Sequence, residues 1–236
     1  MIPSRLLRVY YTVRPILPQR IQIGLRRRLV RLVRRQYRDV WPIDESSGAG
    51  PSGWKGWPEG KRFAFVLTHD VENSKGHDRV KNLAALDEEM GFRSSFNFVP
   101  ERYPVSEELR KSLQDRGFEV GVHGLKHDGK LYASKKIFMD RAERINKYLR
   151  DWGCVGFRSP SMHHNLEWLQ ALNIEYDAST FDIDPFEPQP DGMGTIFPFW
   201  VQTAPEKRGY VELPYTLVQD STLFIYLQEK NIDIWR

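Results

Sequence analysis

Short apolar runs alternate with helical patterns between residue 62 and about residue 178 of this 236-residue chain, and this alternation most limits the folds open to it. The predicted strands are residues 63–67, 95–99, 118–122, 155–157 and 174–178. The predicted helices are residues 77–91, 106–116, 134–150 and 164–172. Strands separated by helices of this length form parallel βαβ units. We therefore predict an α/β fold and favour a (β/α) barrel over an open, doubly wound sheet.

Positive charge is concentrated at the N-terminus. Residues 1–40 contain eleven arginines, no lysine and one acidic residue, Asp39, which gives this segment a net charge of +10. Because the whole chain carries +4, the remaining residues carry −6. The globular part is therefore acidic, and we expect no nucleic-acid partner.

Residues 21–38 predict a basic amphipathic helix. Apolar residues recur at helical spacing among the arginines; they are Ile21, Leu25, Leu29, Leu32 and Val33. Three roles are open: the helix packs on its own domain, makes peripheral contact with an anionic membrane, or belongs to a flexible basic tail. The N-terminal apolar residues are interrupted by arginines, so they predict no secretory signal, and no run approaches the ~18 apolar residues of a membrane span. The expected compartment is the cytoplasm, including the face of its membrane.

Residues 41–61 are rich in Trp, Pro and Gly and lack helical or strand periodicity. Their three tryptophans predict packing against the domain that follows, because large aromatic side chains usually pack on something. The predicted parts of the chain are a basic helical segment at 1–40, this lead-in at 41–61 and a barrel domain at 62–236. From residue 181 the alternation ends, and residues 181–198 predict a long ordered loop.

Ionisable residues follow four of the five predicted strands. They lie in the segments 68–72 and 123–128 and at Arg158 and Asp177. The carboxyl ends of the strands of a parallel barrel meet at one face, where the reactive groups of such barrels gather. A barrel with a purely structural role would not need this pattern, so we expect a functional site at that face.

A metal ion in this chain would have to be held by His and carboxylate side chains. The single cysteine, Cys154, excludes an internal disulfide and a Cys-x-x-Cys site. His123 and His127 are four residues apart, and two imidazoles on one helical turn can hold one cation. The alternative is one buried, hydrogen-bonded histidine beside one exposed histidine.

Two acidic residues follow the first predicted strand. Asp70 and Glu72 are two apart, so in an extended segment their side chains point the same way. One can complete the metal site while the other acts as general base on a metal-bound water. The alternative is that Asp70 caps the next helix.

Three segments in this order resemble the polysaccharide deacetylase family, also called NodB-homology or carbohydrate esterase family 4 proteins. They are Thr68-His69-Asp70-Val71-Glu72, His123-Gly124-Leu125-Lys126-His127 and Phe157-Arg158-Ser159-Pro160. The resemblance covers roughly residues 62–215. It implies a distorted (β/α) barrel, a single divalent metal ion, most often Zn²⁺, and a carbohydrate substrate from which acetyl groups are removed.

The resemblance also implies roles for individual residues. Asp70 matches the catalytic base, Arg158 the arginine that orients it, and His123 and His127 the metal ligands. The family's second aspartate, a ligand, is replaced by Val71 here, so the ligand role passes to Glu72. Pro160 matches the proline that helps shape the groove, and Asp177 is a candidate for a later acidic motif that lines the groove; the alternative for Asp177 is a strand-end residue that caps a turn. Apart from the resemblance, His163 follows the Arg158 motif and is a candidate substrate contact; the alternative is that it has no role.

One expected residue is missing from the sequence. The family supplies a late histidine after its last strand, whereas no histidine follows His164 here. Truncation of a longer deacetylase is the explanation we favour; the others are replacement by another group and weak catalysis. The predicted function is metal-dependent hydrolysis of a sugar N-acetyl bond. Hydrolysis of a small non-sugar amide and a weakly catalytic, metal-retaining binding domain are the alternatives.

Overall fold

The computed structural model describes residues 18–186 and 191–235 of the chain. The chain divides into two compact units, and each is described by itself. Unit 2 comprises residues 50–180 and 197–214. The described part of unit 1 comprises residues 18–49, 181–186, 191–196 and 215–235. Predictions for residues 1–17 and 187–190 lie outside the described residues, and the boundaries predicted at residues 40 and 61 stay predictions.

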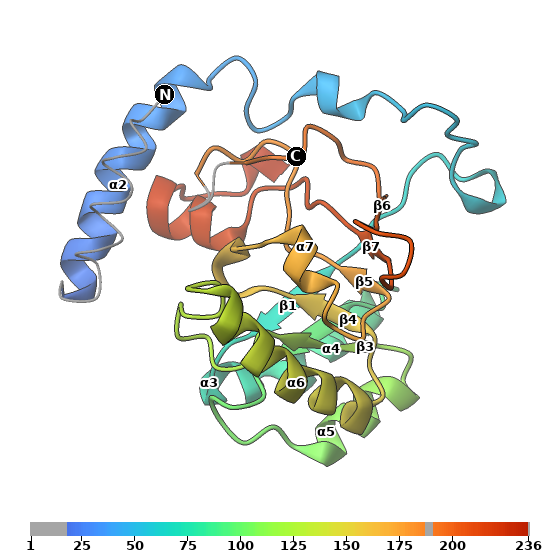
Figure 1. Cartoon of the computed structure of the whole chain (residues 1–236). Helices are drawn as coiled ribbons and strands as arrows, with labels where there is room; N and C mark the ends of the chain where they lie inside the picture. The colour runs from blue at the N-terminus through green and yellow to red at the C-terminus, as the bar shows by residue number, and fades with distance from the viewer. Residues whose placement is uncertain (1–17, 187–190, 236) are drawn as a thin grey trace. The chain divides into compact units, whose positions relative to one another are not determined.

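Unit 2 is built on one seven-stranded sheet with the order β1-β2-β3-β4-β5-β7-β6 (Figure 1). Its strands are β1 (Thr68–Val71), β2 (Ser95–Phe98), β3 (Glu119–His123), β4 (Gly156–Arg158), β5 (Tyr176–Asp177), β6 (Phe199–Val201) and β7 (Tyr210–Glu212). Neighbouring strands are parallel except β6 and β7, which are antiparallel. Among the described residues, β1 and β6 have a strand neighbour on one side only, so the sheet does not close. This arrangement confirms the predicted α/β class and the distorted form of the barrel.

The helices of both units begin and end at identifiable capping residues. The α-helices are α2 (Gln19–Gln36), α3 (Ser74–His77), α4 (Val80–Glu89), α5 (Glu107–Asp115), α6 (Lys135–Trp152) and α7 (Leu166–Leu169). The shorter turns are η2 (Glu45–Gly48), η3 (Pro58–Gly60), η4 (Pro160–Met162) and η6 (Asp233–Trp235), and η5 (Ser221–Leu227) is a π-helix. The hydroxyls of Ser106 and Ser134 accept backbone N–H bonds at the starts of α5 and α6. Gly153, with φ +62°, ends α6 in a left-handed conformation.

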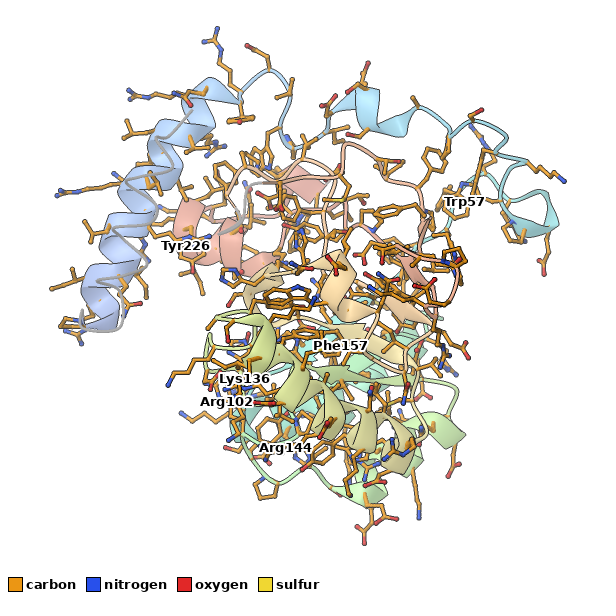
Figure 2. All side chains as sticks on the ribbon, in the orientation of Figure 1. Trp57, Arg102, Lys136, Arg144, Phe157 and Tyr226 are labelled. Carbon is orange, nitrogen blue, oxygen red and sulfur yellow. The ribbon has the colours of Figure 1, made fainter. Side chains whose placement is uncertain are left out.

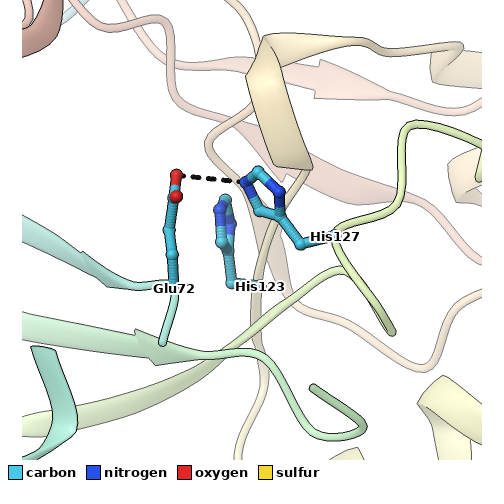
Figure 3. Close-up of side chains that lie close together, drawn as sticks. All are labelled: Glu72, His123 and His127. Atoms are coloured by element: carbon cyan, nitrogen blue, oxygen red, sulfur yellow. Dashed lines mark ion pairs between the residues drawn. The ribbon is translucent and has the colours of Figure 1, made fainter. Parts of the chain in front are cut away.

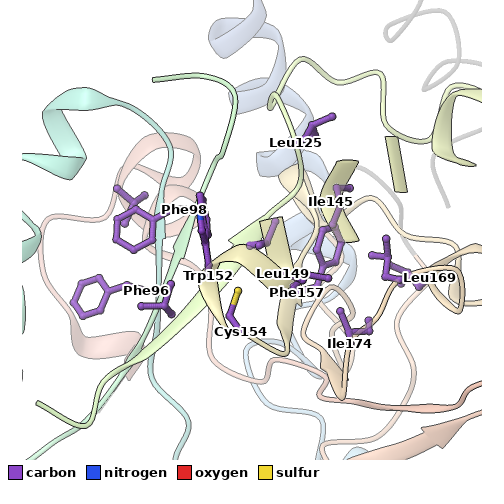
Figure 4. Close-up of a cluster of buried hydrophobic side chains, with 14 of the residues drawn as sticks. Phe96, Phe98, Leu125, Ile145, Leu149, Trp152, Cys154, Phe157, Leu169 and Ile174 are labelled. Carbon is purple, nitrogen blue, oxygen red and sulfur yellow. The ribbon is translucent and has the colours of Figure 1, made fainter. Parts of the chain in front are cut away.

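The core of unit 2 lies between the sheet and helices α5 and α6, both of which pack on β3. Figure 4 shows its apolar side chains, among them Phe96 and Phe98 from β2, Phe157 from β4 and Leu149 from α6. Each of these side chains is almost completely buried. Burial of a side chain of this size stabilises the fold by roughly 1.5–3 kcal/mol, so the core fixes the strands that carry the site.

The first strand begins later than the sequence predicts. The predicted strand at 63–67 is an irregular segment, and β1 starts at Thr68, which pairs with Ser95 of β2. Phe63 and Phe65 remain 73% and 53% exposed. An apolar run shows that a segment favours burial, but it does not show which residues find a partner strand. Strand β1 lies at the edge of the sheet, and among the described residues no strand lies on the side of β1 that faces away from β2. Residues 63–67, which lead into β1, therefore have no partner strand on that side.

Unit 1 has a small apolar core of its own. Val30 and Val33 of α2 pack with Trp41, Phe186 and Leu223, and the rings of Trp41 and Phe186 meet edge to face at 4.9 Å. Helix α2 therefore packs within its own unit, the first of the three roles predicted for it. Among the helices that the structure describes, none has both the length and the apolar composition of a membrane-crossing helix.

The other two tryptophans of the lead-in belong to unit 2. The rings of Trp54 and Trp57 lie 5.2 Å apart, and both contact the ring of Phe197. This aromatic cluster agrees with the prediction that the lead-in packs against the folded domain instead of forming a solvated linker.

Candidate active site

The candidate site lies where neighbouring strands of unit 2 end. Asp70 of β1 is in register with Asn97 of β2, and His123 of β3 is in register with Arg158 of β4. Because these four strands are adjacent and parallel, their carboxyl ends bring the predicted site residues to one edge of the sheet.

Glu72, His123 and His127 form a set that can bind a metal ion. One ligand atom from each residue can be chosen so that the three atoms lie within 4.8 Å of one another. In Figure 3 the three side chains converge, and the dashed line joins Glu72 to His127, whose Oε1 and Nε2 atoms are 3.0 Å apart. Two imidazoles and a carboxylate are a common ligand set for Zn²⁺.

Hydrogen bonding leaves the outer nitrogen of His123 available. Its Nδ1 lies 3.0 Å from the backbone carbonyl oxygen of Arg158, and a carbonyl oxygen can only accept, so Nδ1 carries the proton. The Nε2 atom is then a lone-pair donor, and it is buried without a hydrogen-bond partner in the described chain. Burial lowers the pKa of His123, although the nearby Asp70 carboxylate opposes this, so the neutral, ligand form is favoured.

The Nε2 atom of His127 is also buried without a well-directed hydrogen bond among the described residues. Oε1 of Glu72 lies 3.0 Å from it, the separation of an ion pair. The same imidazole lowers the pKa of Glu72. Buried imidazole nitrogens usually have a hydrogen-bond partner, so two without one, facing a carboxylate, fit a cation.

The backbone around His127 corrects one detail of the prediction. His123 and His127 do not share a helical turn: His123 ends β3, and His127 lies in the loop that follows. Two left-handed residues, Gly124 with φ +62° and His127 with φ +52°, fold this loop back toward the site. The four-residue spacing brings the imidazoles together through the loop, with ring centroids 5.2 Å apart.

Asp70 is held beside the metal-binding set. Its Oδ2 accepts a hydrogen bond from Nε of Arg158 at 3.0 Å, and its Oδ1 accepts one from Nδ2 of Asn97 at 3.3 Å. Burial raises the pKa of Asp70, but the Arg158 guanidinium, His123 and Asn97 outweigh it, so the pKa is lowered overall. The alternative role for Asp70 does not hold, because Asn73 caps the next helix.

Asn97 is a residue that the sequence analysis missed. It lies in the middle of the apolar strand Ser95–Phe98, where a polar side chain is the signal that could have identified it. Its carboxamide occupies the space over Gly121 of β3, where any added Cβ would collide with it. A glycine on the neighbouring strand therefore makes room for the side chain that binds Asp70.

A cavity of about 160 Å³ adjoins His127 in unit 2. Two residues predicted to contact substrate, Pro160 and His163, line this cavity together with Leu131 and Tyr132. Pro160 packs directly on Gly124, where a Cβ would lie 2.5 Å from the proline ring. The loop that carries His127 and the turn after Arg158 are thus in close contact. The substrate roles of Pro160 and His163 stay predictions.

Asp177 of β5 is not part of the Glu72, His123 and His127 set. Its carboxylate is fully buried and accepts hydrogen bonds from the backbone N–H and the hydroxyl of Ser179. Burial raises its pKa, and it faces the buried carboxyl of Glu212. This geometry matches the alternative reading of Asp177, a strand-end residue that caps a turn, and it gives the carboxylate no open face for a substrate.

Solved structures with a similar fold include a candidate polysaccharide deacetylase from Mycobacterium smegmatis, with 20% sequence identity, a TM-score of 0.51 and coverage of 71% of this chain and 63% of that chain. Two others are an allantoinase, at 16% identity with a TM-score of 0.49 over 65% of this chain and 49% of that one, and a family 4 carbohydrate esterase from Streptomyces lividans in complex with acetate, at 16% identity with a TM-score of 0.41 over 50% and 62%.

The similarity to the Mycobacterium smegmatis structure shows a shared fold and confirms the fold that the three motifs imply. This chain spans just under two thirds of the length of that structure, 63%. No protein-family model matches the sequence, and no curated protein matches it either.

Proposed function

We propose that this chain, which has the polysaccharide deacetylase fold, is a metal-dependent hydrolase that removes acetyl groups from N-acetylated sugars of a polysaccharide or glycan precursor. The observation that carries the proposal is the position of the Glu72, His123 and His127 set beside the Asp70–Arg158 ion pair. A ligand set alone would suit a structural metal site. Hydrolysis also requires a general base, and the ionised carboxylate of Asp70 beside the ligand set can serve as one.

Glu72, His123 and His127 would hold one divalent cation, and Zn²⁺ suits their donor atoms. When bound, such a cation polarises a carbonyl group and lowers the pKa of water. The hydrogen bond from His123 to the Arg158 carbonyl fixes the imidazole in its ligand tautomer.

Asp70 is the proposed general base, and its proton acceptor is a carboxylate oxygen. Arg158 and Asn97 each bind one of its two oxygens, which fixes the plane of the carboxylate. The lowered pKa keeps Asp70 ionised at neutral pH, so it is ready to take a proton from water. The cavity lined by His127 would give part of the substrate a place beside the metal-binding set.

The test is acetate release from N-acetylated chitooligosaccharides by the zinc-loaded protein. Asp70→Asn keeps the size of the side chain and should lower the rate by roughly 10²–10⁴-fold, the usual contribution of a general base. It should leave the metal content unchanged. Asp115→Asn, an exposed aspartate of α5, is the matched control and should retain full activity.

Elemental analysis of the purified protein complements this assay. We expect about one zinc or similar ion per chain, lost in the His123→Ala/His127→Ala variant. Turnover that survives Asp70→Asn would refute the assignment of the base. A protein that takes up no metal even when zinc is supplied would refute the metal-dependent activity itself.

A further inference from the structure

Helix α2 has two apolar faces, and only one of them is covered in unit 1. On the covered face, Val30 and Val33 are buried. The arginines on that side have partners: Nε of Arg27 donates to the carbonyl oxygen of Ile225 at 2.9 Å, and Arg34 pairs with Glu229 at 2.6 Å. This face of the helix is accounted for by packing within the unit.

The opposite face presents aliphatic side chains to solvent. Ile21, Leu25 and Leu32 are 48%, 43% and 61% exposed. With Arg28 and Arg35 they follow the spacing i, i+4, i+7, i+11 and i+14, which is a single stripe along an α-helix. In Figure 2, side chains of α2 project away from the side on which Tyr226 lies.

The exposed stripe is bordered by positive charge that remains unneutralised. Arg28, Arg31 and Arg35 are exposed, and within residues 18–186 and 191–235 no carboxylate pairs with them. Arginines on the packed face make bonds inside the unit, so the two faces differ in how their charge is used. A stripe of aliphatic side chains flanked by free guanidinium groups is suited to a surface that is both apolar and anionic.

We propose that this face of α2 docks on an anionic lipid bilayer, with the helix axis in the plane of the interface. The aliphatic stripe would enter the boundary between headgroups and acyl chains, and the arginines would bind lipid phosphates. Charge complementarity supports a lipid occupant: residues 1–40 carry +10 whereas the rest of the chain carries −6. A nucleic acid would use the arginines but not the three aliphatic side chains.

Vesicle co-sedimentation of the full chain tests the proposal. Vesicles of phosphatidylcholine with about 30% phosphatidylglycerol should bind the protein, and pure phosphatidylcholine vesicles should bind it far more weakly. Arg28→Gln/Arg31→Gln/Arg35→Gln should weaken partitioning by about a hundredfold, because each arginine near an anionic surface contributes roughly a fivefold factor to the partition constant. Ile21→Ser/Leu25→Ser/Leu32→Ser should weaken it by roughly tenfold or more.

The matched control removes the same charge elsewhere. Lys55, Lys81 and Lys136 are exposed lysines of unit 2, and their triple replacement by Gln should leave binding unchanged. Because all substituted side chains are exposed, circular dichroism should show an unaltered fold. Equal binding to both kinds of vesicle, or equal loss in the lysine control, would overturn the proposal. So would binding to a DNA duplex in solution that is as tight as vesicle binding and unaffected by the serine substitutions. The acetate assay is separate, so failure here leaves the proposed activity intact.

Discussion

Arg158 contacts Asp70 and His123 through different atoms. Its Nε atom lies 3.0 Å from Oδ2 of Asp70, and its backbone carbonyl oxygen accepts the Nδ1 hydrogen bond of His123 at 3.0 Å. The side chain therefore acts on the proposed base, whereas the backbone acts on a proposed metal ligand. Replacing the side chain separates the two effects, because the carbonyl group stays.

The first prediction concerns the pH dependence of Arg158→Lys. Arg158 lowers the pKa of Asp70, so a weaker partner lets that pKa rise. A base works only when it is ionised, so the acidic limb of kcat/KM should move to higher pH. At pH values below that limb, kcat/KM should fall about tenfold for each unit by which the pKa of Asp70 rises. Zinc content should not change. Arg150→Lys, on the exposed end of α6, is the control. An unshifted pH profile would contradict the role of Arg158.

The second prediction concerns Gly124→Ala. Gly124 has φ +62°, and an added Cβ would lie 2.5 Å from the ring of Pro160. Both effects destabilise the protein, and we expect a loss of about 2–4 kcal/mol in the free energy of unfolding, measured with urea. Gly129→Ala is the matched control: its φ is +72° but no atom lies within 4 Å of the added Cβ. It should cost only about 1 kcal/mol. Equal losses would mean that the contact with Pro160 has no effect.

The third prediction concerns Asp182 of unit 1. Burial raises the pKa of Asp182 to about 6. The group binds its proton more tightly when folded than when unfolded, so its contribution to stability is present below pH ~4 and is lost as pH rises through about 6. Asp182→Asn removes this titration. The change in the free energy of unfolding that the substitution causes should therefore be about 2 kcal/mol more favourable at pH 8 than at pH 4.

Urea unfolding at the two pH values measures this effect. The asparagine still offers an oxygen to the backbone N–H of Ile183, which Asp182 binds at 2.7 Å, so the local turn is kept. Asp115→Asn on exposed α5 serves as the control and should show no such difference between the two pH values. If Asp182→Asn had the same effect at both pH values, the raised pKa would be ruled out.

Much of the fold of unit 2 could be predicted from local signals. The apolar run that forms β2 ends before Pro100, and the run that forms β3 begins after Gly117. Both strands match their predicted ranges to within a residue at each end. Ser134 and Gly153 mark the two ends of α6 in the same way. Strands β6 and β7 were missed because they are three residues long and lie in a segment without apolar alternation.

The site residues could be predicted as a set, but their backbone could not. The spacing of His123 and His127 predicted a helical turn, because four-residue spacing is the helix period, yet a loop with left-handed residues produces the same proximity. Asn97 was missed because its partner, Asp70, is 27 residues away in the sequence. The register of β1 against β2 brings them together, and no local pattern reports that register.

Strand β1 carries Asp70 and leads directly into Glu72, and it is an edge strand among the described residues. Edge strands detach at a lower free-energy cost than strands with two neighbours, so their amide hydrogens exchange with solvent sooner. His123 and Arg158 lie on β3 and β4, which are inner strands. Local opening would therefore remove both acidic groups at once and leave the two imidazoles in place. The site would come apart in two steps, with its carboxylates released first.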